Sequence, residues 1–136
     1  MRTMKFDNNG KEEEITVLSA AGYHDGYYWD MSATIVYNDV EYSIQDAGSG
    51  SGYVPHYSSI SKDGPRKLVT LMQLCESEVI DEDDRNDWEY IEGTICDLLY
   101  DFLKYGCKES LEYIEADDNW SLELHVDGQK VEEEEG

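Results

Sequence analysis

Alternating apolar and polar residues predict strands in the first third of the chain. Residues 14–20, EITVLSA, are rich in β-branched side chains and end at an Ala-Ala-Gly break, which is typical of a strand. From Trp29 to Tyr37 every second residue is apolar, so one face of a strand is predicted to be buried. The period resumes at Val40, Tyr42 and Ile44, after Asn38 and Asp39, two residues that tolerate the positive φ of a tight turn. This pattern predicts a β-hairpin.

The apolar spacing becomes helical in the second half of the chain. Residues 47–63 are rich in glycine and serine and predict a long loop. A helix is predicted from Pro65 to about Glu78, because proline suits a first turn and the apolar residues recur at helical spacing. A longer helix is predicted to begin near Trp88 and to end at Gly106. Its apolar stripe consists of Trp88, Ile91, Ile95, Leu98, Leu99 and Phe102.

The remaining segments complete the predicted fold. Residues Lys108–Ala116 are compatible with a short third helix, and residues 120–126, WSLELHV, alternate as a strand before an Asp-Gly turn. This order predicts an α+β domain, in which an antiparallel sheet of three to four strands carries two or three helices on one face. A chain of 136 residues with 40% hydrophobic content fits a single domain over residues 1–131, followed by a disordered acidic tail at residues 132–136.

Charge restricts the function classes. The chain has 32 acidic and 10 basic residues, a formal net charge of -22 at pH 7. Polyanions and anionic lipids repel such a chain, so direct binding of nucleic acid or membrane is excluded, and basic partners or cations are favoured. Three cysteines without paired spacing argue against a secreted disulfide framework, and the N-terminal residues lack the apolar segment of a signal peptide. We therefore expect a cytoplasmic protein.

Acidic residues are concentrated where few cations can neutralise them. No lysine or arginine occurs from Glu12 to Ser61, and Arg85 is the only one between Leu68 and Leu103. On the long predicted helix, several carboxylates recur at helical spacing without a lysine partner, although a solvated polar face is the ordinary explanation of such a run. The charge pattern gives these candidate partner-binding residues: Asp39, Asp81, Glu82, Asp83, Asp84, Asp87, Glu89, Asp97 and Asp101.

Metal binding and catalysis have weaker support. The acidic linker follows the count of a calcium-binding loop at Asp81, Asp83, Asp87, Glu89 and Glu92. However, Arg85 occupies a ligand position of that loop and Asn86 replaces the glycine of its sharp turn. The cysteines Cys75 and Cys96 lie on or beside apolar stripes, and the three histidines, His24, His56 and His125, are isolated, which disfavours zinc.

No serine elbow occurs, and the GSGSG segment does not lead into a helix, as a phosphate-binding loop would. We therefore expect no metal, no cofactor and no enzymatic activity. An enzyme that uses His56 and a nearby carboxylate is an open alternative.

The order of these segments resembles a known family. EITVLSA, then ATIVYNDVEYSI, then an amphipathic helix and an acidic linker that runs into a second helix are similar to the small phage anti-CRISPR proteins that occupy the PAM-reading site of the type II RNA-guided nuclease. The resemblance covers roughly residues 14–103. It implies that Asn38, Asp39 and Glu41, with Asp83 and Asp84, imitate the PAM duplex and capture the arginines that read it. The loop at residues 47–63 is longer than in that family, the helix before the first strand is lacking, and the C-terminus is extended.

We therefore expect a non-enzymatic inhibitor from a phage or mobile element. It would act in the bacterial cytoplasm as an acidic DNA mimic on a basic DNA-binding protein, most simply a CRISPR effector nuclease. Two further alternatives stay open, an immunity protein that neutralises a basic nuclease toxin and an acidic domain that binds a cation. A pull-down at low salt separates the partner classes, and a calcium-dependent melting shift would favour the cation.

Overall fold

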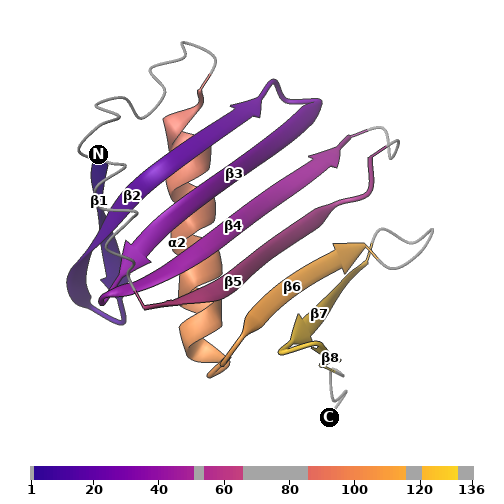
Figure 1. The fold of residues 1–136 in the computed structure, drawn as a ribbon. Coiled ribbons are helices and arrows are strands. Elements are labelled where there is room, and N and C mark those ends of the chain that lie inside the picture. Colours follow the sequence, from indigo (N-terminus) through magenta and orange to yellow (C-terminus); the bar gives the residue numbers. More distant parts are fainter. Residues whose placement is uncertain (1, 51–53, 66–85, 116–120, 132–136) are drawn as a thin grey trace.

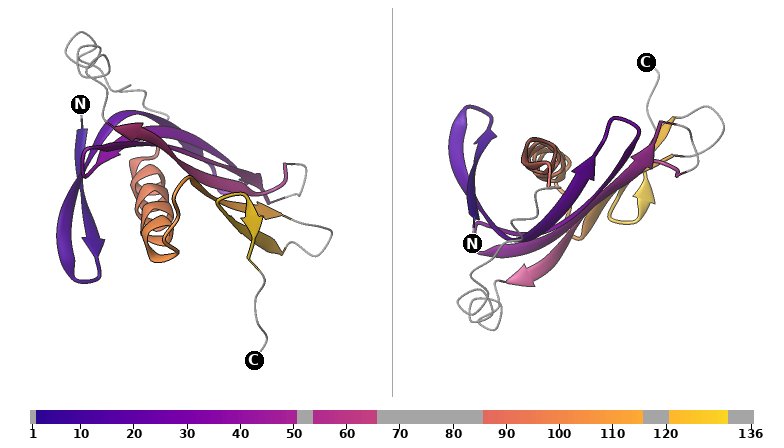
Figure 2. Two further views of the ribbon diagram at one scale, coloured as in Figure 1. Left: turned by 60° about the horizontal axis from the view of Figure 1, so that its bottom comes forward. Right: turned by 90° about the horizontal axis from the view of Figure 1, so that it is seen from above.

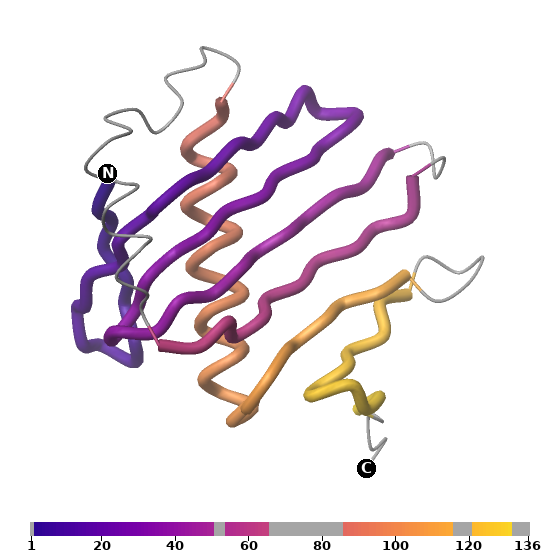
Figure 3. The backbone as a smooth tube through the Cα atoms, in the orientation of Figure 1, coloured from indigo at the N-terminus to yellow at the C-terminus, as the bar shows by residue number. Residues whose placement is uncertain are grey.

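The computed structural model describes residues 2–50, 54–65, 86–115 and 121–131. Their eight strands form one antiparallel sheet in which spatial order equals sequence order (Figure 1), and the tube in Figure 3 follows this meander. The strands are β1 (Arg2–Asn8), β2 (Lys11–His24), β3 (Tyr28–Tyr37), β4 (Val40–Ser49), β5 (Tyr57–Pro65), β6 (Ser110–Glu115), β7 (Leu122–Val126) and β8 (Gln129–Lys130). Among the described residues there is one helix, α2 (Trp88–Lys104).

The sheet curves around α2, which lies against its concave face (Figure 2). The buried side of α2 consists of Ile91, Ile95, Leu98, Leu99 and Phe102. These side chains pack on the inward residues of the strands, chiefly Phe6, Ile15, Val17, Met31, Ile35, Ile44, Ile60 and Leu111. Burial of this apolar surface is the main stabilising contribution. The opposite side of the sheet is named the convex face below.

This architecture shows that the predicted fold class, a sheet of three to four strands with two or three helices, is wrong. The described residues form eight strands and one helix instead. Pro65 is the last residue of β5, not the first turn of a helix. The rest of the helix predicted at residues 65–78 lies outside the described residues, as does the predicted tail at residues 132–136.

Two segments predicted as loop and helix are strands. Most of β5 and the end of β4 fall within the predicted loop at residues 47–63. β5 is poor in bulky side chains, but it pairs with β4 on one edge and β6 on the other, so its backbone groups are satisfied along both sides. The segment Lys108–Ala116 contains β6, in which Leu111 and Tyr113 point to the concave face. Over so short a run, helical and strand spacing are hard to distinguish. β1 was not predicted.

The predicted hairpin, long helix and last strand are confirmed. Asn38 and Asp39 have φ of 53° and 62°, between the paired residues Tyr37 and Val40. The Asp87 carboxylate caps α2 by accepting a hydrogen bond from the Tyr90 backbone N–H at 3.2 Å.

The helix ends as its glycine predicts. Gly106 has a φ of 64°, and the N–H groups of Gly106 and Cys107 donate to the carbonyls of Leu103 and Phe102, which is the Schellman arrangement. The Asp127-Gly128 turn follows β7 with φ of 51° and 82°.

Candidate functional site

Five of the predicted partner-binding residues lie at two ends of the sheet. Asn38 and Asp39 are exposed in the β3–β4 turn, whereas Glu41, two residues further on, is only 6% exposed. Asp87 and Glu89 lie at the start of α2, where the Asp87 N–H donates to the Gly22 carbonyl at 2.9 Å. Gly22 pairs with Met31, so the length of β3 from Met31 to Asn38, roughly 23 Å, separates the two groups. Asp81, Glu82, Asp83 and Asp84 lie outside the described residues.

Two of the predicted residues, Asp97 and Asp101, are neighbours one turn apart on α2. Partial burial and the negative charge of Asp101 raise the pKa of the Asp97 carboxyl above its ordinary value. Asp101 Oδ2 accepts a hydrogen bond from the Tyr113 hydroxyl at 2.6 Å, which directs this carboxylate towards β6. Glu89 and Asp97 are exposed. Because Asp101 contributes to the raised pKa of Asp97, the repulsion expected along this helix is present between these two carboxylates.

Few of the exposed carboxylates are neutralised. The ion pairs with lysine or arginine in the described part of the chain are Arg2–Glu92 at 2.9 Å, Lys5–Glu12 at 2.8 Å and Lys130–Glu123 at 3.1 Å. Within the same residues, Glu14, Asp30, Asp39, Glu89 and Asp97 form no ion pair. These five side chains present fixed negative charge to solvent.

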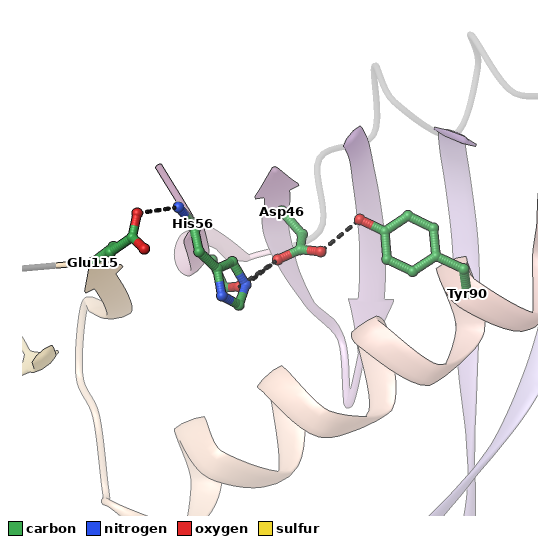
Figure 4. A network of polar contacts seen from close by, with 5 residues as sticks. Asp46, His56, Tyr90 and Glu115 are labelled. Atoms are coloured by element: carbon green, nitrogen blue, oxygen red, sulfur yellow. Dashed lines mark hydrogen bonds and ion pairs between the residues drawn. The ribbon is translucent and has the colours of Figure 1, made fainter. Parts of the chain in front are cut away.

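A second polar group, which we name the Asp46 network, lies on the concave face beside the start of α2 (Figure 4). The Asp46 side chain is 8% exposed and its Oδ1 lies 3.2 Å from His56 Nε2. It accepts hydrogen bonds from the Ser58 hydroxyl and, at 2.5 Å through Oδ2, from the Tyr90 hydroxyl. Glu115 Oε2 accepts from the His56 backbone N–H at 3.2 Å. The network joins β4, β5, β6 and α2.

The sequence contained a signal for this network that the prediction missed. His56 with a nearby carboxylate was an alternative, but Asp46, Ser58 and Tyr90 were not identified. In β4 the inward positions continue from Tyr42 and Ile44 to Asp46, so extending the period of two by one step places a carboxylate on the buried face. Asp46 pairs in register with Ser58 of β5, which brings the two side chains to the same face.

The geometry of the network does not support a serine nucleophile. In a Ser-His-Asp relay the two ring nitrogens have separate partners, the acid and the serine. Here His56 Nε2 faces both Asp46 Oδ1 and Ser58 Oγ, each at 3.2 Å. The Ser58 hydroxyl donates to Asp46 rather than to the imidazole, and Ser58 is only 7% exposed. The arrangement instead satisfies a buried carboxylate and ties the sheet to α2.

Comparison with known proteins assigns no family. No family model, no characterised protein and no solved structure matches this chain. The described residues contain no helix with the length and apolar character needed to cross a membrane. Function must therefore be inferred from the chemistry of the surface and the network.

Aromatic rings surround the Asp46 network. The Trp29 ring meets the His56 ring edge-on at 5.8 Å between centroids, and His24 stacks on Trp29 at 5.8 Å. His24 also contacts the Tyr90 ring at 5.2 Å. Gly48 pairs with Trp29, and a Cβ at this glycine would overlap the indole ring. The missing side chain at Gly48 thus allows Trp29 to lie against β4 and shield His56.

Thiol and metal chemistry receive no support from the described residues. Cys96 and Cys107 are half-buried free thiols, and burial raises the pKa of both, that of Cys107 to about 11, so they are protonated near neutral pH. Cys75 lies outside the described residues. No cluster of three or more His, Cys, Asp or Glu suited to a metal ion occurs within the described ranges.

We expect the stabilising contribution of His56 to depend on pH. The Asp46 hydrogen bond, opposed by burial and assisted by the charges of Asp46 and Glu115, raises the pKa of His56. Burial would raise the pKa of the Asp46 carboxyl, but hydrogen bonds from His56, Ser58 and Tyr90 hold it below its ordinary value. The contribution of His56 is therefore complete below about pH 6.5 and is lost as pH rises through its folded pKa, whereas that of Asp46 is lost in acid, below about pH 3.8.

Chemical denaturation of wild type and His56→Gln at several pH values measures this dependence. The stability difference between the two proteins should be largest near pH 5 to 6, between the two ordinary pKa values, and should shrink towards about pH 9. Comparing the two proteins at each pH removes the effect of overall charge repulsion, which both share. A difference that stays constant from pH 5 to 9, about the range spanned by a histidine titration, would show that protonated His56 adds nothing to stability.

Proposed function

We propose that this protein is a non-enzymatic inhibitor that occupies the polynucleotide-binding site of a basic partner protein with its own carboxylates. The observation that carries the proposal is the set of exposed acidic side chains without ion pairs in the described residues, including Asp39, Glu89 and Asp97. They stand on a helix and a tight hairpin, so the backbone fixes the points from which their charges project, as the sugar backbone does for the phosphates of a nucleic acid. A net charge of -22 would draw the protein to a cleft lined with lysine and arginine.

The electrostatics of α2 support a cationic partner. Partial burial and, after it, repulsion from Asp101 raise the pKa of the Asp97 carboxyl, so the negative charge at this place is unfavourable in the isolated protein. An arginine or lysine of a partner would reverse that cost and form charge-assisted hydrogen bonds. The free energy recovered in this way would appear as affinity, and screening by salt would reduce it.

A CRISPR effector nuclease is the specific target that the family resemblance implies. In that form of the proposal, Asn38 and Asp39 at the β3–β4 turn would contact the PAM-reading arginines. The turn and the start of α2 stand roughly 23 Å apart along β3, so contact with both would require a broad cleft. An immunity protein that covers a nuclease toxin would use the same chemistry, and the identity of the captured partner separates the two.

A pull-down from bacterial lysate tests the class of partner. The full chain is immobilised, lysate is applied at about 50 mM salt, and bound protein is eluted first with duplex DNA and then with about 500 mM salt, because phosphate-like contacts are strongly salt-dependent. Release of a nucleic-acid-binding protein by DNA is expected. Capture of partners that DNA does not displace would contradict the proposal.

Charge reversal then tests whether the array on α2 is responsible. The double variant Glu89→Lys/Asp97→Lys should weaken binding of the captured partner at least about tenfold, because charge-assisted contacts are each worth about 1.5–3 kcal/mol. The matched control, Asp63→Lys/Glu109→Lys, changes the net charge equally at exposed positions that are neither on α2 nor among the five carboxylates. Equal weakening by both variants would indicate unspecific attraction and would exclude a positioned array.

A further inference from the structure

A small hollow lies on the convex face, on the other side of the sheet from α2. It has a volume of about 240 Å³ and is lined by the side chains of Asp30, Ser32, Gln45, Ala47 and Tyr57. Met31 and Asp46 also border it, but strand alternation directs their side chains to the concave face. The volume is below the roughly 300–1,000 Å³ of pockets that bind whole small molecules, so it suits a single side chain.

Strand register explains how the hollow forms. Tyr23 pairs with Asp30, Asp30 with Ala47, and Ala47 with Tyr57, so these four residues form one row across β2, β3, β4 and β5 on the same face. Adjacent strands are about 4.8 Å apart, which places Asp30 and Tyr57 about 10 Å from each other, with the methyl group of Ala47 between them. The small side chain of Ala47 is therefore the floor, and the carboxylate and the ring are opposite walls.

Three polar groups around the hollow have no hydrogen-bond or ion-pair partner in the part of the chain that the structure describes. The Asp30 carboxylate, the Gln45 amide and the Ser32 hydroxyl are exposed and, among the described residues, form no hydrogen bond or ion pair. All three can accept hydrogen bonds from a ligand. Tyr57 is held in place, because its hydroxyl donates to Glu112 Oε2 at 2.9 Å. The hollow thus combines unoccupied acceptors and the negative charge of Asp30 with an aromatic wall that a hydrogen bond holds in place.

We propose that this hollow binds an arginine side chain of the basic partner protein. A guanidinium group carries five N–H donors in a plane, which matches the acceptors of Asp30, Gln45 and Ser32, and its flat face can stack on Tyr57. Lysine offers a compact ammonium group that cannot stack in this way, so arginine fits the site better. The negative charge of the chain as a whole favours the same partner chemistry.

Exposed tyrosines beside the hollow extend the contact surface. Tyr23 is 47% exposed, and Tyr27 and Tyr28 of the β2–β3 turn are 50% and 42% exposed. The turn is ordered by Asp25, whose Oδ1 accepts hydrogen bonds from the N–H groups of Tyr27 and Tyr28 at 2.8 and 2.7 Å. A fixed turn that presents tyrosines loses little entropy on binding, as is common in protein interfaces.

The inference deepens the proposed function and rests on it in one respect: the arginine is assigned to the basic partner protein proposed above. Its test needs no natural partner. A capped hexa-arginine peptide is titrated into the full chain, labelled with ¹⁵N, at about 150 mM salt, where unspecific attraction is screened beyond about 8 Å. The backbone amides of Asp30, Gln45 and Tyr57 are expected to shift with the peptide, and a capped hexa-lysine peptide is expected to bind more weakly.

Two variants and two matched controls localise the binding. Ala47→Leu fills the hollow without changing charge, and Asp30→Asn removes its carboxylate charge; each should weaken binding of hexa-arginine about tenfold. Ser19→Leu adds similar bulk at an exposed position of β2 that pairs with Thr34, outside the hollow, and Glu109→Gln removes an exposed charge just before β6; neither should change the affinity. Should Ala47→Leu fail to fold, the comparison of Asp30→Asn with Glu109→Gln decides alone.

Three results would overturn the inference: equal affinities for all four variants, unshifted amides at the hollow, or equal binding of the two peptides. The outcomes are independent of the pull-down. Capture of a nucleic-acid-binding protein with no peptide binding at the hollow would retain the proposed function and remove this contact. Peptide binding at the hollow without such a protein in the pull-down would retain the arginine site and contradict the proposed function.

Discussion

Replacement of Asp46 by alanine is expected to lower the free energy of unfolding by about 3–5 kcal/mol, because it removes a buried acceptor from three donors. Tyr90, Ser58 and His56 all direct their polar atoms at this carboxylate. The two hydroxyl groups and the imidazole N–H would remain partly buried without an acceptor, which costs more free energy than the loss of a contact at the surface. Denaturation with urea near pH 6 measures the change.

Two further variants show whether the loss comes from the network. Tyr90→Phe removes one donor and should cost about 1–2 kcal/mol. Asp30→Ala removes an exposed carboxylate from the neighbouring strand and should alter stability by less than about 0.5 kcal/mol. A loss in Asp46→Ala no greater than that in Asp30→Ala would mean that the hydrogen bonds of the network do not stabilise the fold.

Replacement of Gly22 by alanine is expected to destabilise the protein by about 1–3 kcal/mol through overpacking. A Cβ at Gly22 would lie 2.5 Å from Ile91 Cγ1 and 2.9 Å from Met31 Cβ, both fully or nearly fully buried. The Gly22 N–H also donates to Asn86 Oδ1 at 3.1 Å, so the first turn of α2 is docked at this glycine. The added methyl group would push α2 away from β2 and strain this contact.

A glycine within α2 supplies the control for Gly22→Ala. Gly93 is exposed, and a Cβ at this position would meet nothing within 4 Å. Gly93→Ala should therefore stabilise the protein by about 0.5–1 kcal/mol through helix propensity alone. Thermal or urea unfolding compares the two variants. A neutral Gly22→Ala would show that α2 can shift without cost, contrary to the tight packing of Ile91.

The elements that were predicted correctly are those with strong local signals. The hairpin at Asn38 and Asp39 combines regular alternation with residues that adopt positive φ, and α2 combines a long apolar stripe with a glycine at its end. Both signals act within a few residues, so no knowledge of the rest of the fold is needed to interpret them.

The errors in the fold have a different origin, since they concern strands that depend on their neighbours. β5 contains one large apolar residue, Ile60, and owes its stability to pairing with β4 and β6 on either side. Such pairing is invisible in the local pattern, because serine is a poor strand former in isolation. The same limit applies to the candidate site. Asp46 and Tyr90 are distant in sequence, and their contact depends on how α2 docks on the sheet.

For the acidic residues, the amount of charge could be predicted from the sequence, but the position of each carboxylate in the fold could not. Their excess over basic residues is evident from composition, and the repulsion between Asp97 and Asp101 follows from helical spacing. The buried position of Glu41, however, does not follow from strand alternation, because its neighbour Tyr42 takes the inward position and the pairing with β5 shifts register between these two residues. Sequence alone therefore indicated the kind of partner chemistry better than the surface that would carry it.

The strictly sequential strand order has a consequence for biosynthesis. Each strand from β2 to β5 can zip onto the one before it through a short connection, which costs little loop-closure entropy. The pairing of β5 with β6 must instead wait for α2 and the residues around it to emerge from the ribosome. We expect the N-terminal meander to assemble during translation with its apolar concave face exposed. The nascent chain would therefore depend on chaperones until α2 has been synthesised and packs on that face.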